Sequence, residues 1–381
     1  MIIIFQRILP HYRTGFFIKF AAKFKKSKIL YGQPFKDESL KNDDLKNDDT
    51  FQKVKNLYFN KKGSIFISEI FGIIKKAKPE VVISVFNTGN LNIYILFLLR
   101  KIYKFKIILW SFGYDPIRGF NPAKNLTDKI RLYLSEKADA VIFYWQSGKA
   151  EIEKFSDRKE HFFVAPNTLD TDRLFLLKER FDKTGKEKIR SELGIIEKNH
   201  FIYIGRLLKD KEVDILIKAF SELLSNGRDV RLTIIGDGPE RSSLEQLVKK
   251  HNVKNICFTG EILDEEQTGK WIYISDAFIM PGRLGLSVVH SFCFGTPVIS
   301  QKKEKYFHGE GVGYIKEGVN GFLVEDGNIK ALSDKMSEII SNADKAKELK
   351  KNAYLTARND CSIEKMIEGF EKAIEYTVSQ Q

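Results

Sequence analysis

The sequence predicts an α/β protein built from two doubly wound parallel-sheet domains. Three observations support this prediction. The chain has 381 residues, which suits two α/β domains of ordinary size. Short apolar runs alternate with segments whose apolar residues recur at helical spacing, the pattern of β-α-β units. The alternation occurs twice, and a Pro-Asn-Thr stretch at 166–168, followed by a charged segment, separates the two series.

The first series begins with an apolar run that predicts a buried strand at 2–9, and further runs of this kind follow. The other expected strands are 29–31, 54–58, 81–86, 107–110, 140–144 and 161–164. We expect a loop at 11–15 and a helix directly after it. A second helix is expected at 90–102. The polar stretch 36–50 predicts a solvated loop, because charged residues dominate it.

The second series repeats the pattern with clearer turn signals. Its expected strands are 201–205, 230–235, 256–259, 277–280, 298–300 and 321–324, and its expected helices include 213–224 and one that starts near 240. We therefore place a first domain at 1–169, a linker at 170–196 and a second domain at 197–361. The last segment, 362–381, carries an apolar stripe typical of an amphipathic helix.

The segment 277–300 reads as strand, loop, helix and strand. Gly282 and Gly285 lie in the loop, where they allow the backbone to approach a ligand closely. The helix that follows directs free N–H groups and the positive end of its dipole at the same point. A tight turn that binds nothing would have the same pattern. The other loops of this domain favour an anion site.

Three loops of the second domain converge at the carboxyl ends of their strands. Arg206 and Lys211 follow the first strand, a Gly-Asp-Gly turn at 236–238 follows the second, and 282–285 follows a later one. Two cations, a glycine turn and a helix N-terminus are typical of a diphosphate site. The turn lacks the third glycine of a dinucleotide fingerprint, because Arg241 stands there.

Composition and charge exclude several classes. The formal net charge is +13, and the excess of Lys and Arg lies in the first 167 residues. A basic surface attracts phosphates of an anionic membrane or an acidic substrate. We expect no nucleic-acid partner, because base-reading motifs are lacking. No apolar run approaches the roughly 20 residues that span a bilayer, and no secretion signal is recognisable. We expect a cytoplasmic protein able to bind peripherally to the inner face of the plasma membrane.

The cysteines and acidic pairs do not suggest a metal site. Cys257, Cys293 and Cys361 are widely spaced in apolar surroundings, which favours buried thiols. Asp170 and Asp172 have an Asp-x-Asp spacing, which can hold a metal cation together with a diphosphate. They lie at the domain exit, far from the glycine loops, so a helix cap is the favoured interpretation. We therefore expect no metal and no cofactor.

The motifs of the second domain resemble those of glycosyltransferase family 4. The resemblance rests on Gly-Arg-Leu at 205–207, Lys211, 214–220, Gly-Asp-Gly-Pro at 236–239, Gly260, Gly-Leu-Ser at 285–287, Gly-Thr-Pro-Val-Ile at 295–299 and 318–324. The family consists of retaining, nucleotide-sugar-dependent enzymes of the GT-B fold, in which two Rossmann-like domains face a central cleft. It implies sugar transfer to a glycan or lipid-linked acceptor, often in cell-surface polysaccharide or lipopolysaccharide synthesis.

The resemblance also implies roles for individual residues. Arg206 and Lys211 are the expected catalytic residues, because fixed cations stabilise the charge that grows on the departing diphosphate without a metal. The expected donor-binding residues are Gly15, Gly205, Gly236, Gly238, Gly260, Glu261, Arg283, Leu284, Gly285, Leu286 and His290. The first domain is expected to hold the acceptor, with His11, Arg13 and Asp115 as candidate contacts. Asp115 fits a turn cap equally well. The helix at 362–381 is expected to pack back on this domain.

The sequence departs from the family pattern at two positions that concern the donor. Most members carry glutamates where this chain has Gly282 and His290. His290 fits a hydrogen bond to a ribose hydroxyl, or a histidine satisfied within helix packing. Two other functions would use the same diphosphate site: a sugar-nucleotide epimerase of the GT-B fold and a catalytically silent nucleotide-sugar-binding protein.

Overall fold

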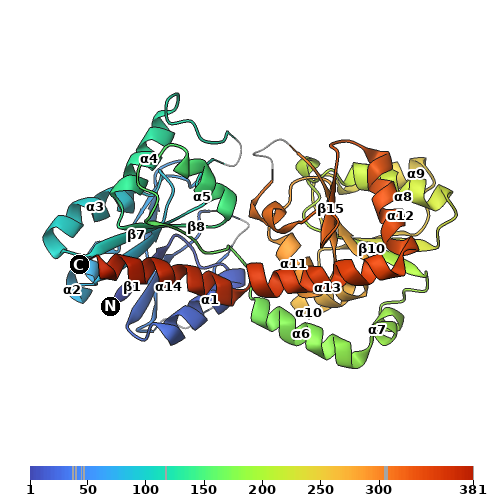
Figure 1. The fold of residues 1–381 in the computed structure, drawn as a ribbon, viewed down its shortest axis with the longest axis horizontal. Helices are drawn as coiled ribbons and strands as arrows, with labels where there is room; N and C mark the ends of the chain where they lie inside the picture. Colours follow the sequence, from blue (N-terminus) through green and yellow to red (C-terminus); the bar gives the residue numbers. More distant parts are fainter. Residues whose placement is uncertain are drawn as a thin grey trace. The chain divides into compact units, whose positions relative to one another are not determined.

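A computed structural model describes residues 1–36, 38, 41–43, 45, 48–115, 118–303 and 308–380 (Figure 1). The chain divides into two compact units. The first comprises residues 1–170 with 363–381, and the second comprises 171–362. Each unit contains a parallel sheet flanked by helices, which is the expected α/β class.

The first unit is organised around a seven-stranded parallel sheet in the order β3-β2-β1-β6-β7-β8-β9. The strands are β1 (Ile2–Gln6), β2 (Ser27–Gly32), β3 (Phe51–Val54), β6 (Val81–Val85), β7 (Lys106–Ser111), β8 (Ala140–Phe143) and β9 (Phe162–Val164). A separate antiparallel hairpin consists of β4 (Asn56–Tyr58) and β5 (Phe66–Ser68). The expected strand 54–58 is thus wrong as a single element, because the chain leaves the main sheet after Val54.

The helices of the first unit are α1 (His11–Lys23), α2 (Phe71–Ala77), α3 (Leu91–Tyr103), α4 (Leu126–Lys137), α5 (Gln146–Glu153) and α14 (Ile363–Ser379). The expected loop at 11–15 is wrong, because α1 begins at His11, directly after Pro10. Proline has a fixed φ and lacks an N–H, so it suits the residue that precedes a helix. The expected loop at 36–50 lies partly outside the described residues.

The C-terminal helix α14 belongs to the core of the first unit. Its residue Phe370 packs against Phe16 of α1 and Trp110 of β7, with ring centroids 4.9 and 5.0 Å apart. Gly369 lies so close to β9 that a Cβ there would be 2.3 Å from the Val164 carbonyl oxygen. Figure 1 shows α14 beside α1, and Lys23 forms an ion pair with Glu371 of α14 at 2.7 Å.

The second unit contains a six-stranded parallel sheet in the order β12-β11-β10-β13-β14-β15. The strands are β10 (Asn199–Ile204), β11 (Val230–Ile235), β12 (Ile256–Gly260), β13 (Ala277–Ile279), β14 (Val298–Gln301) and β15 (Gly321–Val324). The helices are α6 (Thr171–Thr184), α7 (Lys186–Glu192), η1 (Lys209–Lys211), α8 (Val213–Ser225), α9 (Arg241–Lys250), α10 (Glu265–Ile274), α11 (Ser287–Cys293), η2 (Glu310–Tyr314), α12 (Ile329–Ser341) and α13 (Ala343–Asp360).

The segment expected to be a linker, 170–196, is helical from Thr171 onward. It forms α6 and α7, which pack on the second unit through buried apolar side chains. Phe181 of α6 stacks on Phe294 with ring centroids 5.8 Å apart, and Ile189 of α7 is fully buried. Both helices carry many charged residues on their exposed faces. The amino-acid composition of 170–196 is therefore similar to that of a connector, although each helix has an apolar stripe. In the described part of the chain, no helix combines the length and apolar character needed to cross a membrane.

Candidate functional site

The order of strands in the second unit reverses between β10 and β13. The chain adds β11 and β12 on one side of β10, and then β13, β14 and β15 on the other side. Ligands of doubly wound sheets bind outside the carboxyl ends of the strands at such a reversal. The two loops that flank this position are 205–212, after β10, and 280–286, after β13. They contain the residues expected to act on the diphosphate.

Backbone contacts of glycines hold together the three loops that follow β10, β11 and β12. A Cβ on Gly236 would lie 2.0 Å from the Gly205 carbonyl oxygen, and one on Gly238 would lie 2.5 Å from that of Leu207. Gly236 N–H donates to the Gly260 carbonyl at 2.8 Å, and Leu207 N–H donates to the Asp237 carbonyl at 2.9 Å. These positions accept no side chain. Gly236 and Gly238 therefore shape the loops, while Gly205 and Gly260 supply the carbonyls that face Gly236.

Gly282 joins the loop after β13 to the loop after β10. Its N–H donates to the Lys211 carbonyl at 3.1 Å, and Arg283 N–H donates to the Asp210 carbonyl at 2.8 Å. A Cβ on Gly282 would lie 2.2 Å from the Asp210 carbonyl oxygen. The packing of the two loops therefore requires glycine here and leaves no room for a glutamate side chain at position 282.

Lys211 is fixed within this junction. Its Nζ donates to the Arg283 carbonyl at 2.5 Å. Burial lowers the pKa of Lys211, the Asp210 carboxylate opposes that shift, and the Arg283 charge adds to it. The Asp210 carboxylate also lies 4.0 Å from the Arg283 guanidinium. Sequence reasoning missed Asp210. Its position between Lys211 and Arg283 depends on the fold of the loop, so the spacing of residues along the chain gave no signal.

Arg206 differs from Lys211 in its surroundings. Its side chain is exposed and makes no hydrogen bond or ion pair with any residue that the structure describes. Its carbonyl accepts a hydrogen bond from the Tyr203 hydroxyl at 3.0 Å, which fixes the backbone at the start of the loop. A guanidinium held on a fixed backbone, with its donors free, is suited to bind phosphate oxygens.

The backbone amides after Gly282 are not equivalent. Leu284 N–H donates to His308 Nδ1 at 3.2 Å, so this amide is already used within the protein. His308 Nε2 lies 2.9 Å from the Gln301 carbonyl, which places its proton on Nε2. The amides of Gly285 and Leu286 have no acceptor among the described residues and remain available. Sequence reasoning missed His308, because only the fold brings it to this loop.

His290 lies on α11 with one ring nitrogen buried. Its Nε2 has no hydrogen-bond partner among the described residues. Burial lowers the pKa of His290 to about 4, so the ring is neutral at pH 7. Its ring lies 5.7 Å from that of Phe294, centroid to centroid. A neutral imidazole with an unused nitrogen can accept or donate one further hydrogen bond. Glu261, after β12, is exposed.

The candidate residues of the first unit have different environments. Arg13 is buried and donates to Gln6 Oε1 at 3.3 Å and to Asn167 Oδ1 at 3.0 Å. Its guanidinium carbon lies 4.6 Å from the centre of the Trp110 ring. These contacts give Arg13 a packing role inside the unit. His11 is exposed at the first position of α1.

Gly15 and Asp115 also serve local structure in the first unit. A Cβ on Gly15 would lie 2.4 Å from the Asp170 carboxylate, so glycine lets that carboxylate approach α1. Asp115 Oδ1 accepts the Arg118 N–H at 2.9 Å, and its carbonyl accepts the Gly119 N–H at 2.8 Å. Asp115 therefore caps a turn, the alternative that its sequence context left open.

Comparison with known proteins finds similarity to glycosyltransferases. Residues 185–356 match the model of the group 1 glycosyl transferases. The uncharacterized glycosyltransferase MJ1059 of Methanocaldococcus jannaschii is 26% identical over 349 residues, which cover 81% of this chain and 82% of that protein. The alpha-D-kanosaminyltransferase of Streptomyces kanamyceticus is 24% identical over 188 residues, 47% of either chain.

The fold has solved counterparts. Anabaena HepE in complex with UDP matches with a TM-score of 0.72 at 16% identity, over 98% of this chain and 99% of that one. HepE in complex with UDP-glucose matches with a TM-score of 0.66 at 17% identity, over all of both chains. At this identity the likeness shows the fold alone, which is GT-B. The match with the family model therefore places a group 1 glycosyl transferase domain in the second unit of this chain.

Proposed function

We propose that this protein transfers a sugar from a nucleotide-sugar donor to a glycan or lipid-linked acceptor in the synthesis of cell-surface polysaccharide or lipopolysaccharide. The observation that carries this proposal is the junction of the loops after β10 and β13. It presents the exposed Arg206, the half-buried Lys211 and the free amides of Gly285 and Leu286 at one switch point. That arrangement suits a diphosphate, and the relative HepE was crystallised with UDP and UDP-glucose.

The chemistry we propose follows from where charge develops. As the bond between the sugar and the diphosphate breaks, negative charge grows on the phosphate oxygens. Arg206 and Lys211 stabilise that charge, so the reaction proceeds without a metal. The acceptor hydroxyl attacks the face that the leaving group vacates, the phosphate takes the hydroxyl proton, and the anomeric configuration is retained. The amides of Gly285 and Leu286 orient the donor.

His290 is proposed to contact the ribose. Two observations support this role. The Nε2 of His290 is buried and lacks a hydrogen-bond partner among the described residues, and the imidazole ring is neutral at pH 7. A hydrogen bond to a ribose hydroxyl would satisfy that nitrogen. We expect His290→Ala to weaken nucleotide binding about tenfold, or about 1.4 kcal/mol, in a calorimetric titration with UDP. Unchanged nucleotide affinity would remove His290 from the site.

Membrane association is proposed for the first unit of a cytoplasmic enzyme. Leu98 and Ile102, one helical turn apart on α3, are 64% and 69% exposed. Lys101 and Lys104 flank them and are also exposed. Apolar side chains among lysines suit an anionic lipid surface. We expect binding to phosphatidylglycerol-containing vesicles that high salt weakens and that Leu98→Ser with Ile102→Ser reduces further. Equal binding by the variant would contradict this surface.

A binding panel tests the proposed function. UDP-, GDP- and dTDP-sugars are added to the full-length protein, and the thermal midpoint of unfolding is recorded for each, because specific binding raises apparent stability. The donor that binds is then offered with saccharide and lipid-linked acceptors, with and without EDTA. We expect transfer that EDTA does not change. Release of a free sugar epimer without acceptor, or binding without any transfer, would contradict the proposal.

A further inference from the structure

A cavity of about 730 Å³ lies at the carboxyl ends of the central strands of the first unit. Arg7, just after β1, lines it together with Asn87 and Gly89, just after β6. The strands β1 and β6 are neighbours, and the order of strands reverses between them. The cavity therefore lies at the switch point of this sheet, where doubly wound folds bind ligands.

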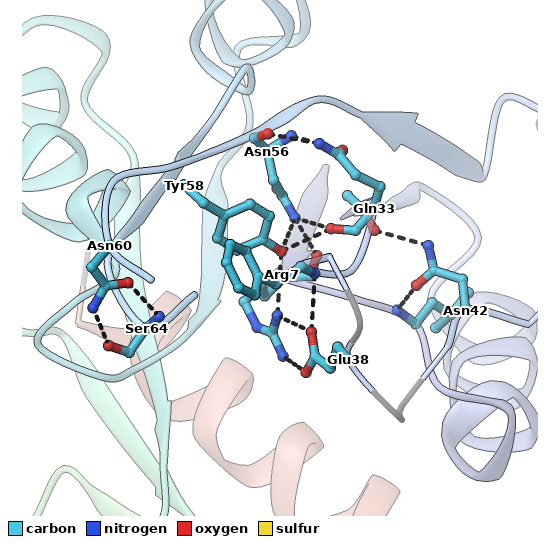
Figure 2. A network of polar contacts seen from close by, with 11 residues as sticks. Arg7, Gln33, Glu38, Asn42, Asn56, Tyr58, Asn60 and Ser64 are labelled. Atoms are coloured by element: carbon cyan, nitrogen blue, oxygen red, sulfur yellow. Dashed lines mark hydrogen bonds and ion pairs between the residues drawn. The ribbon is translucent and has the colours of Figure 1, made fainter. Parts of the chain in front are cut away.

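One wall of the cavity contains Arg7 and Glu38, which belong to a connected polar network (Figure 2). The Arg7 guanidinium donates two hydrogen bonds to the Glu38 carboxylate, one of them at 2.7 Å, and one to the Tyr58 hydroxyl at 3.2 Å. The Asn56 side-chain amide donates to the carbonyls of Arg7 and Gln33, both at 2.8 Å. This wall is held in place before any ligand arrives.

Another part of the lining comes from the loops at 61–65 and 87–89, which pack tightly against each other. A Cβ on Gly89 would lie 2.0 Å from the Ser64 carbonyl oxygen, and Phe66 N–H donates to the Gly89 carbonyl at 3.0 Å. Gly63 has a φ of +64°, and a Cβ there would lie 2.6 Å from the Phe35 ring. The hairpin loop at 59–65 is thus fixed against both neighbours, and it holds its lysines at the rim of the cavity.

The charge of the cavity is predominantly positive. Its described lining contains five cationic side chains, those of Arg7, Lys36, Lys61, Lys62 and Arg131, and two acidic ones, those of Glu38 and Asp115.

Both carboxylates, and two of the cations, already have partners. The hydrogen bond from Arg7 lowers the pKa of Glu38, so this pair stays ionised. Asp115 caps its turn, and Arg131 lies 3.2 Å from Asp128. The three lysines are exposed and form no ion pair with any described residue.

We propose that this cavity binds an anionic group, a carboxylate or a phosphate, of the saccharide that accepts the transferred sugar. Lys61 and Lys62 supply the charge, with Lys36 from the facing segment. Phe35 lines the cavity, packs against Tyr58 with ring centroids 5.1 Å apart, and supplies an apolar surface for a sugar ring. This inference rests on the proposed transferase function, and it assigns an acidic acceptor to an enzyme whose sequence identifies none.

Binding of small probes to the full-length protein tests the inference. Glucose 1-phosphate, methyl glucuronide and neutral methyl glucoside are titrated by calorimetry, with UDP present to occupy the phosphate site of the second unit. We expect at least one anionic probe to bind at least tenfold more tightly than methyl glucoside. The better of the two identifies the acceptor group as phosphate or carboxylate. Equal affinity for the neutral and anionic probes would overturn the proposal.

A pair of matched variants separates this cavity from general surface charge. Lys61→Gln with Lys62→Gln should weaken the anionic probe at least tenfold. Lys25→Gln with Lys26→Gln removes the same charge from exposed neighbours in the turn before β2, and should change affinity less than twofold. Loss of affinity for the anionic probe in both variants, or in neither, would contradict the proposal that this cavity binds the anionic group. If the first pair lowers the thermal midpoint, Lys36→Gln replaces it with the same expected direction.

UDP binding keeps the two proposals distinguishable. Both variant pairs should bind UDP as the unaltered protein does, because the changed lysines belong to the first unit. A protein that binds UDP and transfers sugar but ignores the anionic probes would retain the proposed function and refute the cavity. A protein that binds no nucleotide would refute the proposed function, and the probe titration would still decide the cavity because it needs no turnover.

Discussion

Gly282→Ala and Gly285→Ala are expected to have different effects on stability, although the two glycines are three residues apart in one loop. A Cβ on Gly282 would lie 2.2 Å from the Asp210 carbonyl oxygen and 2.4 Å from the Lys211 carbonyl carbon. A Cβ on Gly285 meets nothing within 4 Å. The first substitution must therefore separate two loops, and the second changes only the surface that faces the donor.

The size of the first effect follows from those distances. Backbone atoms would have to move by about 1 Å to restore ordinary contacts, and overpacking of this kind costs about 1–3 kcal/mol. For a unit of this size, each kcal/mol lowers the thermal midpoint by about 2–4 °C. The same movement displaces Lys211, whose Nζ is fixed on the Arg283 carbonyl, and a misplacement of about 1 Å can cost about a hundredfold in rate.

Thermal unfolding and steady-state transfer assays measure both quantities. Gly282→Ala should unfold at a lower temperature and lose transfer activity. Gly285→Ala should keep its midpoint and weaken donor binding, because the added methyl group keeps the donor from the free amide. A Gly282→Ala protein as stable and as active as the original would refute the reasoning that the two loops are in contact.

Two further predictions concern buried groups. Burial lowers the pKa of His200 to about 3, so the unfolded chain binds a proton below pH 6.5 that the folded one rejects. The contribution of neutral His200 to the free energy of unfolding is complete above pH 6.5 and falls by about 2 kcal/mol by pH 5. In urea unfolding, His200→Gln should therefore lose less stability than the unaltered protein over that pH range. Gly369→Ala places a Cβ 2.3 Å from the Val164 carbonyl oxygen and should destabilise α14 by about 1–3 kcal/mol in thermal unfolding. Gly72→Ala in α2, whose Cβ meets nothing within 4 Å, is its control and should leave stability unchanged or raise it.

The parallel sheets and many of their strands could be predicted because parallel strands, buried on both faces, form continuous apolar runs. The runs at 81–86, 107–110 and 230–235 became β6, β7 and β11 within a residue at each end. The segment 170–196 was misjudged because its charged residues outnumber its apolar ones. The apolar residues that decide its structure, Phe181 among them, find partners that are distant in sequence. The overall composition of this segment therefore does not show the apolar stripe, which can be recognised only from the packing of the helices.

The candidate site divides in the same way. Glycines and cations after β10 and β13 could be found from the sequence, because their chemistry is local to each loop. The role of Gly282 could not, since it depends on the approach of Asp210, and His308 reaches Leu284 only through the fold. Arg13 stays a predicted acceptor contact from its position after β1. Its contact with Trp110 inside the first unit is one that no spacing predicts.

The central claim is that two fixed cations stabilise the departing diphosphate. The most direct measurement is kcat for sugar transfer by Arg206→Met with Lys211→Met, compared with a control that removes the same charge from the exposed Lys209 and Arg228. Loss of one such donor typically costs about a hundred- to a thousandfold in kcat, so the first pair should lose at least about a thousandfold and the control less than about threefold. Transfer at the original rate by the Arg206 and Lys211 variant would contradict the account.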